Sequence, residues 1–333
     1  MSNSLEAGVG PGSERSPSPR WELLRALGAL SATSPRLSKP ISEALGLGEW
    51  SPAEHTRLFV LDLPPYCSIY LGPEGKLGGE GADRVAGFWR ALGLEAPASP
   101  DHLACLLALY AELGQAAQTC RRAEVRRRLD HARSALLGEH LVPWLPSYLA
   151  AAASYPAGTA WARLMLSALE QEVALTNLPS DMLPIALRDA GAPIEETISY
   201  SDLLEALTTP VRAGFILTAS DLEQAGRQTR VGVRRGERRF ALDAMLAQDP
   251  PGVLSWLSRH ARRWATLHLR PSSGAAGYWW HQRSKATADV LGRLCQRLRS
   301  GCEDARERFG QTVPESACGD KRIDSRHRSG ELF

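Results

Sequence analysis

Apolar residues recur every three or four positions through most of this chain, and this spacing restricts the fold more than any other feature of the sequence. Trp21, Leu24, Leu27 and Leu30, for example, fall on one face of a helix and not on alternate positions of a strand. Runs of β-branched residues are short, as at residues 231–233, and do not predict strands. We therefore expect an all-α fold.

Prolines divide this helical pattern into separate segments. Ser51-Pro52, Ser99-Pro100 and Asp249-Pro250 each place a capping residue before a proline at the first helical position, which is typical of a helix start. Pro64-Pro65 instead ends a helix, because proline lacks an N–H donor and clashes with the preceding turn. The sequence thus indicates many short and medium helices joined by brief loops.

The same pattern divides the chain into five parts. The polar N-terminal segment has no hydrophobic periodicity and should be disordered. After the main helical region, three short capped helices should form a compact C-terminal unit. The expected parts are a disordered segment at 1–19, an all-helical domain at 20–210, the small helical unit at 211–270, a part at 271–313 and a disordered tail at 314–333. The part at 271–313 consists of a Ser/Gly/Ala hinge at 271–277 followed by a charged helix.

Residues 55–70 are the clearest candidate for a recognition surface. They begin as an amphipathic helix with His55 and Phe59, and the helix stops at Pro64-Pro65. Phe59 suits either the core or a contact with a partner. Tyrosine offers apolar area and one polar tip, which suits contact with a partner. After the prolines we expect an extended segment that presents Tyr66, Ser68 and Tyr70.

Two further segments carry candidate charged contacts. Asp101 either favours the positive end of a helix dipole or, beside His102, receives an arginine of a bound peptide, and both readings stay open. Leu106 lies on the apolar stripe of the following helix. Glu139 stands near a helix end, where the dipole disfavours a negative charge, so we expect a partner for it, either internal or on a basic peptide.

The residues after Glu139 have mainly structural interpretations. We expect His140 to have a satisfied hydrogen bond, Pro143 to kink the chain and Trp144 to be a large buried ring. The glycine-rich residues 72–81 should form a flexible loop. Gly75-Lys76 does not complete a phosphate-binding loop, because that motif needs a glycine five positions earlier and a serine or threonine after the lysine.

Several classes of function have no support in the sequence. Neither a G-x-S-x-G nor an H-E-x-x-H motif is present, and the eight histidines are dispersed. The formal net charge of +2 and the balanced basic runs predict no nucleic-acid binding. No apolar stretch approaches roughly 18 residues, and the N-terminus lacks the apolar core of a secretory signal. We expect a cytoplasmic, non-enzymatic protein with free cysteines and without metal, cofactor or membrane insertion.

Three segments in this order resemble the TorD-type chaperones, which include the nitrate reductase delta-subunit-like proteins. They are His55-Thr-Arg-Leu-Phe59 leading to Pro64-Pro65-Tyr66-Cys67-Ser68-Ile69-Tyr70, then Pro100-Asp101-His102-Leu103, then Glu139-His140-Leu141-Val142-Pro143-Trp144. The resemblance covers about residues 20–210. The sequence departs from the family at His55, where an aromatic residue is frequent, and at Cys67, where Glu or Ala is common.

The resemblance implies an all-helical chaperone that binds the apo form of a molybdopterin-dependent oxidoreductase through its N-terminal segment, often a twin-arginine signal peptide. Such a chaperone, a monomer or a homodimer, holds its client until the cofactor is inserted and delays export until then. The alternative is a helical adaptor or regulatory protein that binds an unrelated partner.

For either function we expect one groove, lined by residues 55–70, 101–110 and 139–148. Asp101 and Glu139 would meet basic residues of the bound segment, and Phe59, Tyr66 and Leu106 would meet its apolar part. The candidate contact residues are His55, Phe59, Pro65, Tyr66, Ser68, Tyr70, Asp101, His102, Leu106, Glu139, His140, Pro143 and Trp144.

Overall fold

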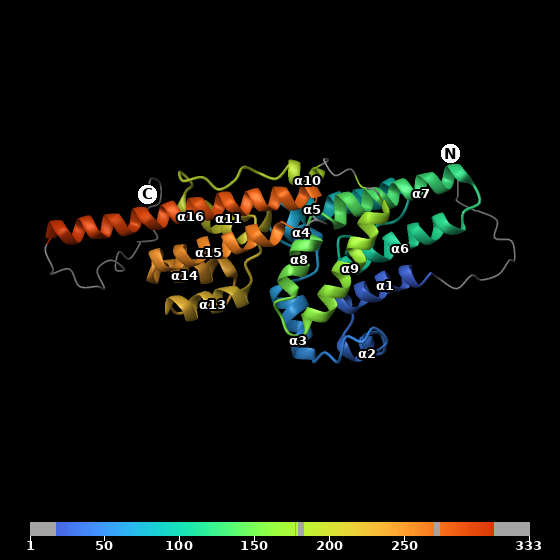
Figure 1. The fold of residues 1–333 in the computed structure, drawn as a ribbon, viewed down its shortest axis with the longest axis horizontal. Helices are drawn as coiled ribbons and strands as arrows, with labels where there is room; N and C mark the ends of the chain where they lie inside the picture. Colours follow the sequence, from blue (N-terminus) through green and yellow to red (C-terminus); the bar gives the residue numbers. More distant parts are fainter. Residues whose placement is uncertain (1–17, 177, 179–182, 270–273, 310–333) are drawn as a thin grey trace.

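The computed structural model describes residues 18–176, 178, 183–269 and 274–309, with side chains as far as residue 301. Within these residues every regular element is a helix, so the all-α prediction is confirmed (Figure 1). An isolated antiparallel bridge joins Tyr66 to His102 in this part of the chain. The segments predicted to be disordered, 1–19 and 314–333, lie outside the described residues except for Ser18 and Pro19.

Helix α6 is central to the first half of the molecule and packs against both α1 and α7 (Figure 1). The predicted apolar face of α1 is buried from Trp21 to Leu30. Gly114 of α6 permits the close approach of α1, because a Cβ there would lie 2.4 Å from the Trp21 ring. The helices of this half are α1 (Pro19–Ala32), α2 (Pro35–Ala44), α3 (Pro52–Thr56), α4 (Cys67–Leu71), α5 (Gly79–Ala91), α6 (Leu103–Thr119), α7 (Ala123–Ala135), α8 (Leu145–Ala152) and α9 (Gly158–Thr176).

Two helices end in a turn of π-helix shortly before a proline. The π-helix η1 (Arg57–Asp62) continues α3, and η2 (Leu136–Leu141) continues α7. The N–H of Leu63 donates to the carbonyl of Leu58 at 2.8 Å, a span of five residues that is typical of such a turn. The start predicted at Ser51-Pro52 is confirmed, because Ser51 and Glu54 form a capping box.

The second half is dominated by the long helix pair α15 and α16. The start predicted at Asp249-Pro250 is confirmed, since the Asp249 carboxylate accepts from the N–H of Gly252 at 2.9 Å. However, α15 has 19 residues, so the expectation of three short helices is wrong. The helices are α10 (Ile185–Arg188), α11 (Tyr200–Thr208), α12 (Pro210–Ala213), α13 (Ala219–Thr229), α14 (Arg238–Gln248), α15 (Pro250–His268) and α16 (Gly274–Phe309).

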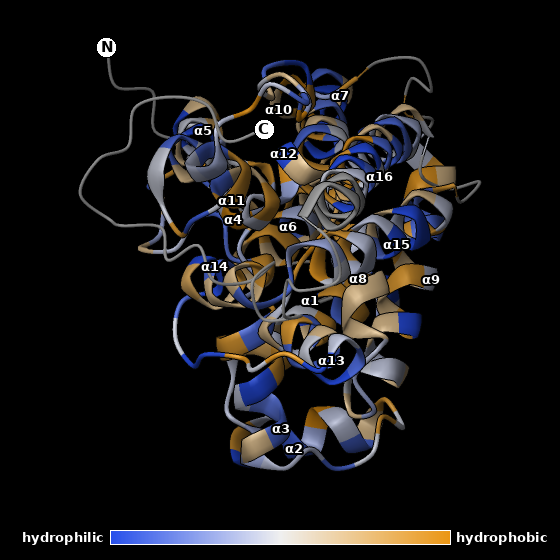
Figure 2. Cartoon of the chain, turned by 90° about the vertical axis from the view of Figure 1, so that its left-hand side faces the viewer, coloured by the Kyte–Doolittle hydropathy of each residue, from blue (hydrophilic) through white to orange (hydrophobic). Residues whose placement is uncertain are grey.

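The predicted hinge before the last helix is shorter than expected. Residues 274–277 already belong to α16, which begins at Gly274 and not at Tyr278, while residues 270–273 lie outside the described part of the chain. Apolar side chains cause this early start, because Ala276 and Trp280 are both buried. Figure 2 shows hydrophobic residues toward α4 and α6 in the interior and hydrophilic residues along α15 and α16.

Polar contacts join the two halves at the junction of α8, α15 and α16. The indole N–H of Trp280 donates to the carbonyl of Pro143 at 2.6 Å. His268 of α15 lies between Ser147, at 3.3 Å, and the carbonyl of Gly214, at 2.9 Å. All these side chains are buried, so the C-terminal unit packs directly on the region that carries the predicted site.

Candidate functional site

Two of the three predicted segments pair along their backbones at the start of α6. The N–H of Cys67 donates to the carbonyl of Asp101 at 3.0 Å, and the N–H of Leu103 donates to that of Pro65 at 2.8 Å. The Asp101 carboxylate accepts from the N–H of Ser68 at 3.0 Å. Because Asp101 is only 2% exposed, its observed role is to cap the first turn of α4.

The helix start predicted at Ser99-Pro100-Asp101 is wrong. Helix α6 begins at Leu103 and its cap is His102, whose Nδ1 accepts from the N–H of Ala104 at 3.1 Å. Burial lowers the pKa of His102, although the nearby Asp101 charge acts in the opposite direction. A neutral ring suits this role, because only an unprotonated Nδ1 can accept a hydrogen bond.

The extended segment expected after the two prolines is also wrong, because residues 67–71 form the short helix α4. Ser68 and Tyr70 are buried, at 0% and 2% exposed, and do not face solvent. The Tyr70 hydroxyl donates to the carbonyl of Pro64 at 3.0 Å, and the Tyr148 hydroxyl donates to that of Leu63 at 3.0 Å. These two tyrosines satisfy the carbonyls of the proline turn, which the helix ladder cannot reach.

The third segment joins the other two through aromatic packing. The Trp144 ring stacks on Tyr70 with centroids 5.2 Å apart, and its indole N–H donates to the carbonyl of His140 at 2.8 Å. Trp144 is fully buried, as predicted. Burial lowers the pKa of His140 to about 4, helped by the positive charge of Arg84. His140 is therefore neutral near neutral pH and packs against the ring of Phe88.

Glu139 has an internal partner. Its carboxylate accepts from the N–H of Ile185 at 2.8 Å, at the start of α10. The side chain keeps part of its surface accessible. A negative charge that is unfavourable at the end of its own helix is thus placed at the favourable end of another helix.

His55 and Phe59 belong to an aromatic cluster that continues through Trp161 to Tyr148, with the centroids of those two rings 6.3 Å apart. Phe59 stacks on Trp50, with centroids 5.2 Å apart, and meets Trp161 edge-on at 5.1 Å. His55 Nε2 lies 3.1 Å from the carbonyl oxygen of Leu30, so the His55 ring connects α3 to α1. These contacts are those of a core and leave Phe59 3% exposed.

The structure therefore brings the three segments together but fills the expected groove with their own side chains. Only part of the predicted set keeps accessible surface, namely His55, Tyr66 and Glu139. The buried members are Phe59, Pro65, Ser68, Tyr70, Asp101, His102, Leu106, His140, Pro143 and Trp144.

The glycine-rich loop covers α4. Residues 79–81 of the expected loop instead form the first turn of α5, where a Cβ on Gly81 would lie 2.8 Å from the Cα of Ser68. Within the loop, the N–H of Gly78 donates to the Ser68 hydroxyl at 3.3 Å. Gly75 has a φ of +61°, and a Cβ there would lie 3.0 Å from Thr209. The expected flexible loop is therefore packed closely on both α4 and the end of α11, and its glycines permit that approach.

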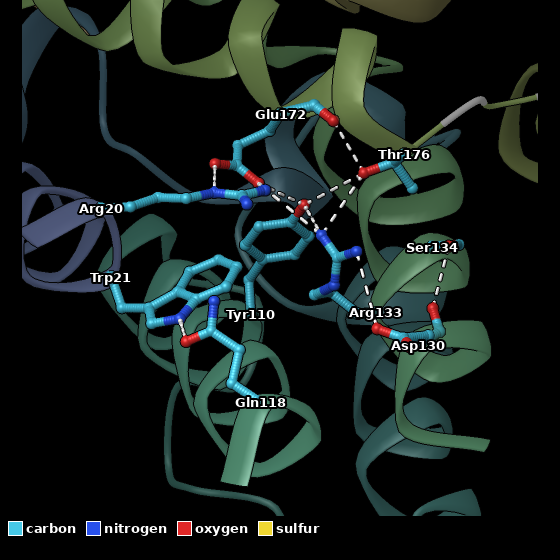
Figure 3. Close-up of polar contacts among 9 residues, drawn as sticks. All are labelled: Arg20, Trp21, Tyr110, Gln118, Asp130, Arg133, Ser134, Glu172 and Thr176. Atoms are coloured by element: carbon cyan, nitrogen blue, oxygen red, sulfur yellow. Dashed lines mark hydrogen bonds and ion pairs between the residues drawn. The ribbon is translucent and has the colours of Figure 1, made fainter. Parts of the chain in front are cut away.

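Sequence reasoning missed a buried ionic cluster at the far end of the first half. Glu172 of α9 is 3% exposed, pairs with Arg20 and lies 3.7 Å from Arg133 (Figure 3). The Tyr110 hydroxyl donates to Glu172 at 2.8 Å, and burial raises the pKa of Tyr110 to about 12. The four residues lie on α1, α6, α7 and α9, so no local spacing in the sequence indicates that they meet.

A second missed cluster surrounds Asp62, at the end of η1. Asp62 is 6% exposed and accepts from the hydroxyls of Tyr155, at 2.9 Å, and Ser220, at 2.6 Å. Arg57 lies 3.6 Å from the same carboxylate. Ser220 belongs to α13, so this cluster also connects the first half of the molecule to the C-terminal unit.

The described residues contain no candidate membrane span and no cluster of metal-binding side chains. None of the helices in this part of the chain combines the length and apolarity needed to cross a membrane. Likewise, His, Cys, Asp and Glu side chains do not gather there in groups of three or more that could hold a metal ion.

Comparison with known proteins gives one match. Residues 31–150 match the family model described as nitrate reductase delta subunit, and this stretch contains all three of the segments that meet around α4. No curated protein and no solved structure matches the chain. Residues 31–150 are therefore similar to the nitrate reductase delta subunit family, and the match covers less than half of the chain.

Proposed function

We propose that this protein is a non-catalytic, cytoplasmic assembly chaperone for a molybdenum-cofactor oxidoreductase. It binds the N-terminal segment of the apo client, including a twin-arginine signal peptide where the client has one. The observation that supports this proposal is the convergence of the three family segments around α4, joined by the backbone pairing of Cys67 with Asp101 and the stacking of Tyr70 on Trp144. In this proposal residues 20–210 form the chaperone domain.

Tyr66 is the member of the predicted set best suited to meet the client. It is half-buried, its backbone bridges to His102, and its ring stands edge-on to the His102 ring at 4.7 Å. The ring is therefore held in position while one side remains accessible. We propose that it meets the apolar part of the client segment and that Glu139 meets a basic residue, while Asp101 and Ser68 act as positioning residues.

The proposal is tested by isolating the protein from its native cells and identifying what accompanies it by mass spectrometry. A molybdenum oxidoreductase that lacks its cofactor is the expected partner. Enrichment of unrelated proteins without any oxidoreductase would instead favour the adaptor function.

A peptide with the N-terminal sequence of the captured oxidoreductase then tests the site. We expect a dissociation constant near micromolar, which corresponds to about 8 kcal/mol. Tyr66→Ala should weaken binding by about tenfold or more, since aromatic anchors dominate such contacts. The matched control is Tyr278→Ala on α16, where the side chain is 61% exposed. Equal affinities for the two variants would remove Tyr66 from the site.

A further inference from the structure

The charges of this chain are strongly segregated, which the net charge of the whole chain conceals. Residues 18–210 contain 16 Lys and Arg against 22 Asp and Glu, a formal net charge of −6. Residues 211–301 contain 16 against 6, a formal net charge of +10. Such asymmetry within one chain favours attraction between the basic part and anionic molecules, which include nucleic acids, anionic membranes and acidic proteins.

A cleft lies where the acidic half meets this basic unit. It has a volume of about 370 Å³, and its walls come from α3 and η1, from the loop between α8 and α9, and from α13 and α15. Three arginines line it, Arg57, Arg227 and Arg263. They are accompanied by hydroxyl groups of Ser154, Thr218 and Ser220.

The acidic side chains of this cleft already have partners. Glu54 completes the capping box of α3 with Ser51, and Asp221 completes that of α13 with Thr218. Arg57 is paired with Asp62 and with Glu223, at 3.2 Å.

The two remaining arginines of the cleft differ from Arg57 in their lack of an acidic partner among the described residues. Arg227 and Arg263 are exposed, and neither forms an ion pair within the described residues. The cleft thus presents two guanidinium groups whose charges the protein itself leaves uncompensated. Guanidinium forks bind carboxylates through two parallel hydrogen bonds, which gives geometric selectivity as well as attraction.

The basic surface continues beyond the cleft along the end of α13. Arg230 caps that helix in the left-handed conformation, and Arg234 and Arg235 follow in the exposed loop before α14. A ligand that used all these groups would be longer than a single small anion. The cleft offers Tyr155 as its only ring, and the hydroxyl of that ring is bound to Asp62, whereas single-stranded nucleic acids need exposed aromatic platforms. A recessed polar cleft is also a poor match for a flat lipid surface.

We propose that the cleft between η1 and α13 binds an acidic segment of a partner polypeptide, with Arg227 and Arg263 holding its carboxylates. This site shares Arg57 and Leu58 with the first of the three segments, but Arg227 and Arg263 lie on α13 and α15, so the proposal does not depend on the function proposed for those segments. The chain's own undescribed ends do not supply the occupant on charge grounds, because residues 1–17 and 302–333 each have a formal net charge of only −1.

The test is a titration of the full-length protein into a fluorescein-labelled decapeptide of alternating Glu and Ser, followed by anisotropy. The double variant Arg227→Glu with Arg263→Glu should lose about tenfold or more in affinity. The control has the same change in charge on the same unit but away from the cleft, Lys285→Glu with Arg299→Glu on α16, and should lose less than about threefold. Both pairs are exposed, so thermal melting should be nearly unchanged.

Three results would overturn the proposal. The peptide could fail to bind, or the two double variants could weaken binding equally, which would show general attraction to the basic unit and no site. A single-stranded oligonucleotide or phosphatidylserine vesicles could also bind more tightly than the peptide at the same salt concentration and lose affinity in the cleft variant, which would assign the cleft to another class of ligand.

Replacement of both arginines by lysine keeps the charge and should weaken peptide binding by only about threefold to fivefold if the fork geometry contributes.

Discussion

The two halves of this molecule are both built from helices but differ in the charged groups that they bury. In residues 18–210 the buried polar groups include carboxylates, such as Asp62, Asp101 and Glu172, and each accepts hydrogen bonds from specific partners. In residues 211–301 the buried polar groups include a neutral histidine, His268, which contacts Ser147 and the carbonyl of Gly214. The abundant cations of this half lie at or near the surface. The first half therefore contains charged groups in its interior, whereas the described cations of the second half lie at or near the surface.

The largest expected effect comes from the ionic cluster in Figure 3. Glu172→Ala should lower the free energy of unfolding by about 3–5 kcal/mol, because it leaves the largely buried guanidinium of Arg133 with the more exposed Asp130, 3.8 Å away, as its remaining acidic partner. Urea denaturation measures this change. Glu124→Ala is the matched control, since its ion pair with Arg128 is exposed and should contribute less than about 0.5 kcal/mol. Similar costs for both variants would show that burial of the acid does not matter.

Acidic pH should lower the stability of the fold through one buried histidine in each half. Burial lowers the pKa of His268 and of His140 to about 4, below the ordinary value near 6.5, so the fold favours their neutral forms. The resulting stability is complete above about pH 6.5 and is lost as the pH falls toward 4, by at most about 1.4 kcal/mol per pH unit for each ring. Urea denaturation at a series of pH values from about 7.5 to about 4.5 should show this decline in the free energy of unfolding.

Replacement of one histidine in each half separates their contributions. His268→Gln and His140→Gln should each reduce the slope of stability against pH, because each removes one group that takes up a proton on unfolding. His131→Gln, on the exposed face of α7, is the control and should leave the slope unchanged. A slope that none of the three variants alters would mean that other groups cause the acid sensitivity.

An intermediate effect is expected at the cap of α4. Asp101→Ala leaves the N–H of Ser68 buried without an acceptor and should cost about 1–3 kcal/mol in unfolding free energy. Asp101→Asn keeps an acceptor oxygen in the same place and should cost less. If instead Asp101→Ala weakened client binding without any change in melting, the contact with a peptide arginine would become the better interpretation of this residue.

The smallest effect is expected at Phe240 of α14, which is 59% exposed although Leu242 and Leu246 of the same helix are buried. Phe240→Ser should change the unfolding free energy by less than about 0.5 kcal/mol. Leu242→Ala on the same helix is fully buried and should cost about 2–5 kcal/mol. Thermal melting of both variants compares the two losses of stability. Equal losses would show that Phe240 contributes to the core of the second half.

Local chemistry predicted the helices well where nothing distant competed with it. Ser51 and Asp249 cap the helices expected of them, because a side-chain oxygen beside the first turn needs no other partner. At Ser99-Pro100 the same signal failed, because backbone pairing with residues 65–67 holds Asp101 and His102 outside the helix. A local motif cannot report that pairing.

The sequence predicted which segments lie together but not how deeply their side chains are buried. The resemblance to a family correctly grouped residues 55–70, 100–103 and 139–144, which the fold brings into contact. Whether Tyr70 faces solvent or Trp144 depends on packing between helices that lie far apart in the sequence. For the same reason no spacing indicated that Asp62 would meet Ser220 or that Glu172 would meet Arg20.

The π-helical turns η1 and η2 have a consequence for how these segments tolerate change in length. Each turn contains one residue more than an α-helix would need, and one residue corresponds to a rotation of about 100° around a helix axis. Because the π-turn accommodates that extra residue, deletion of Val60, which is 59% exposed, should leave a regular α-helix that keeps Asp62 and the two prolines directed toward α13 and α6. Conversion of the same turn to an α-helix without a deletion would instead rotate these residues by about 100°, so the length of this segment must match its type of helix for the three segments to meet.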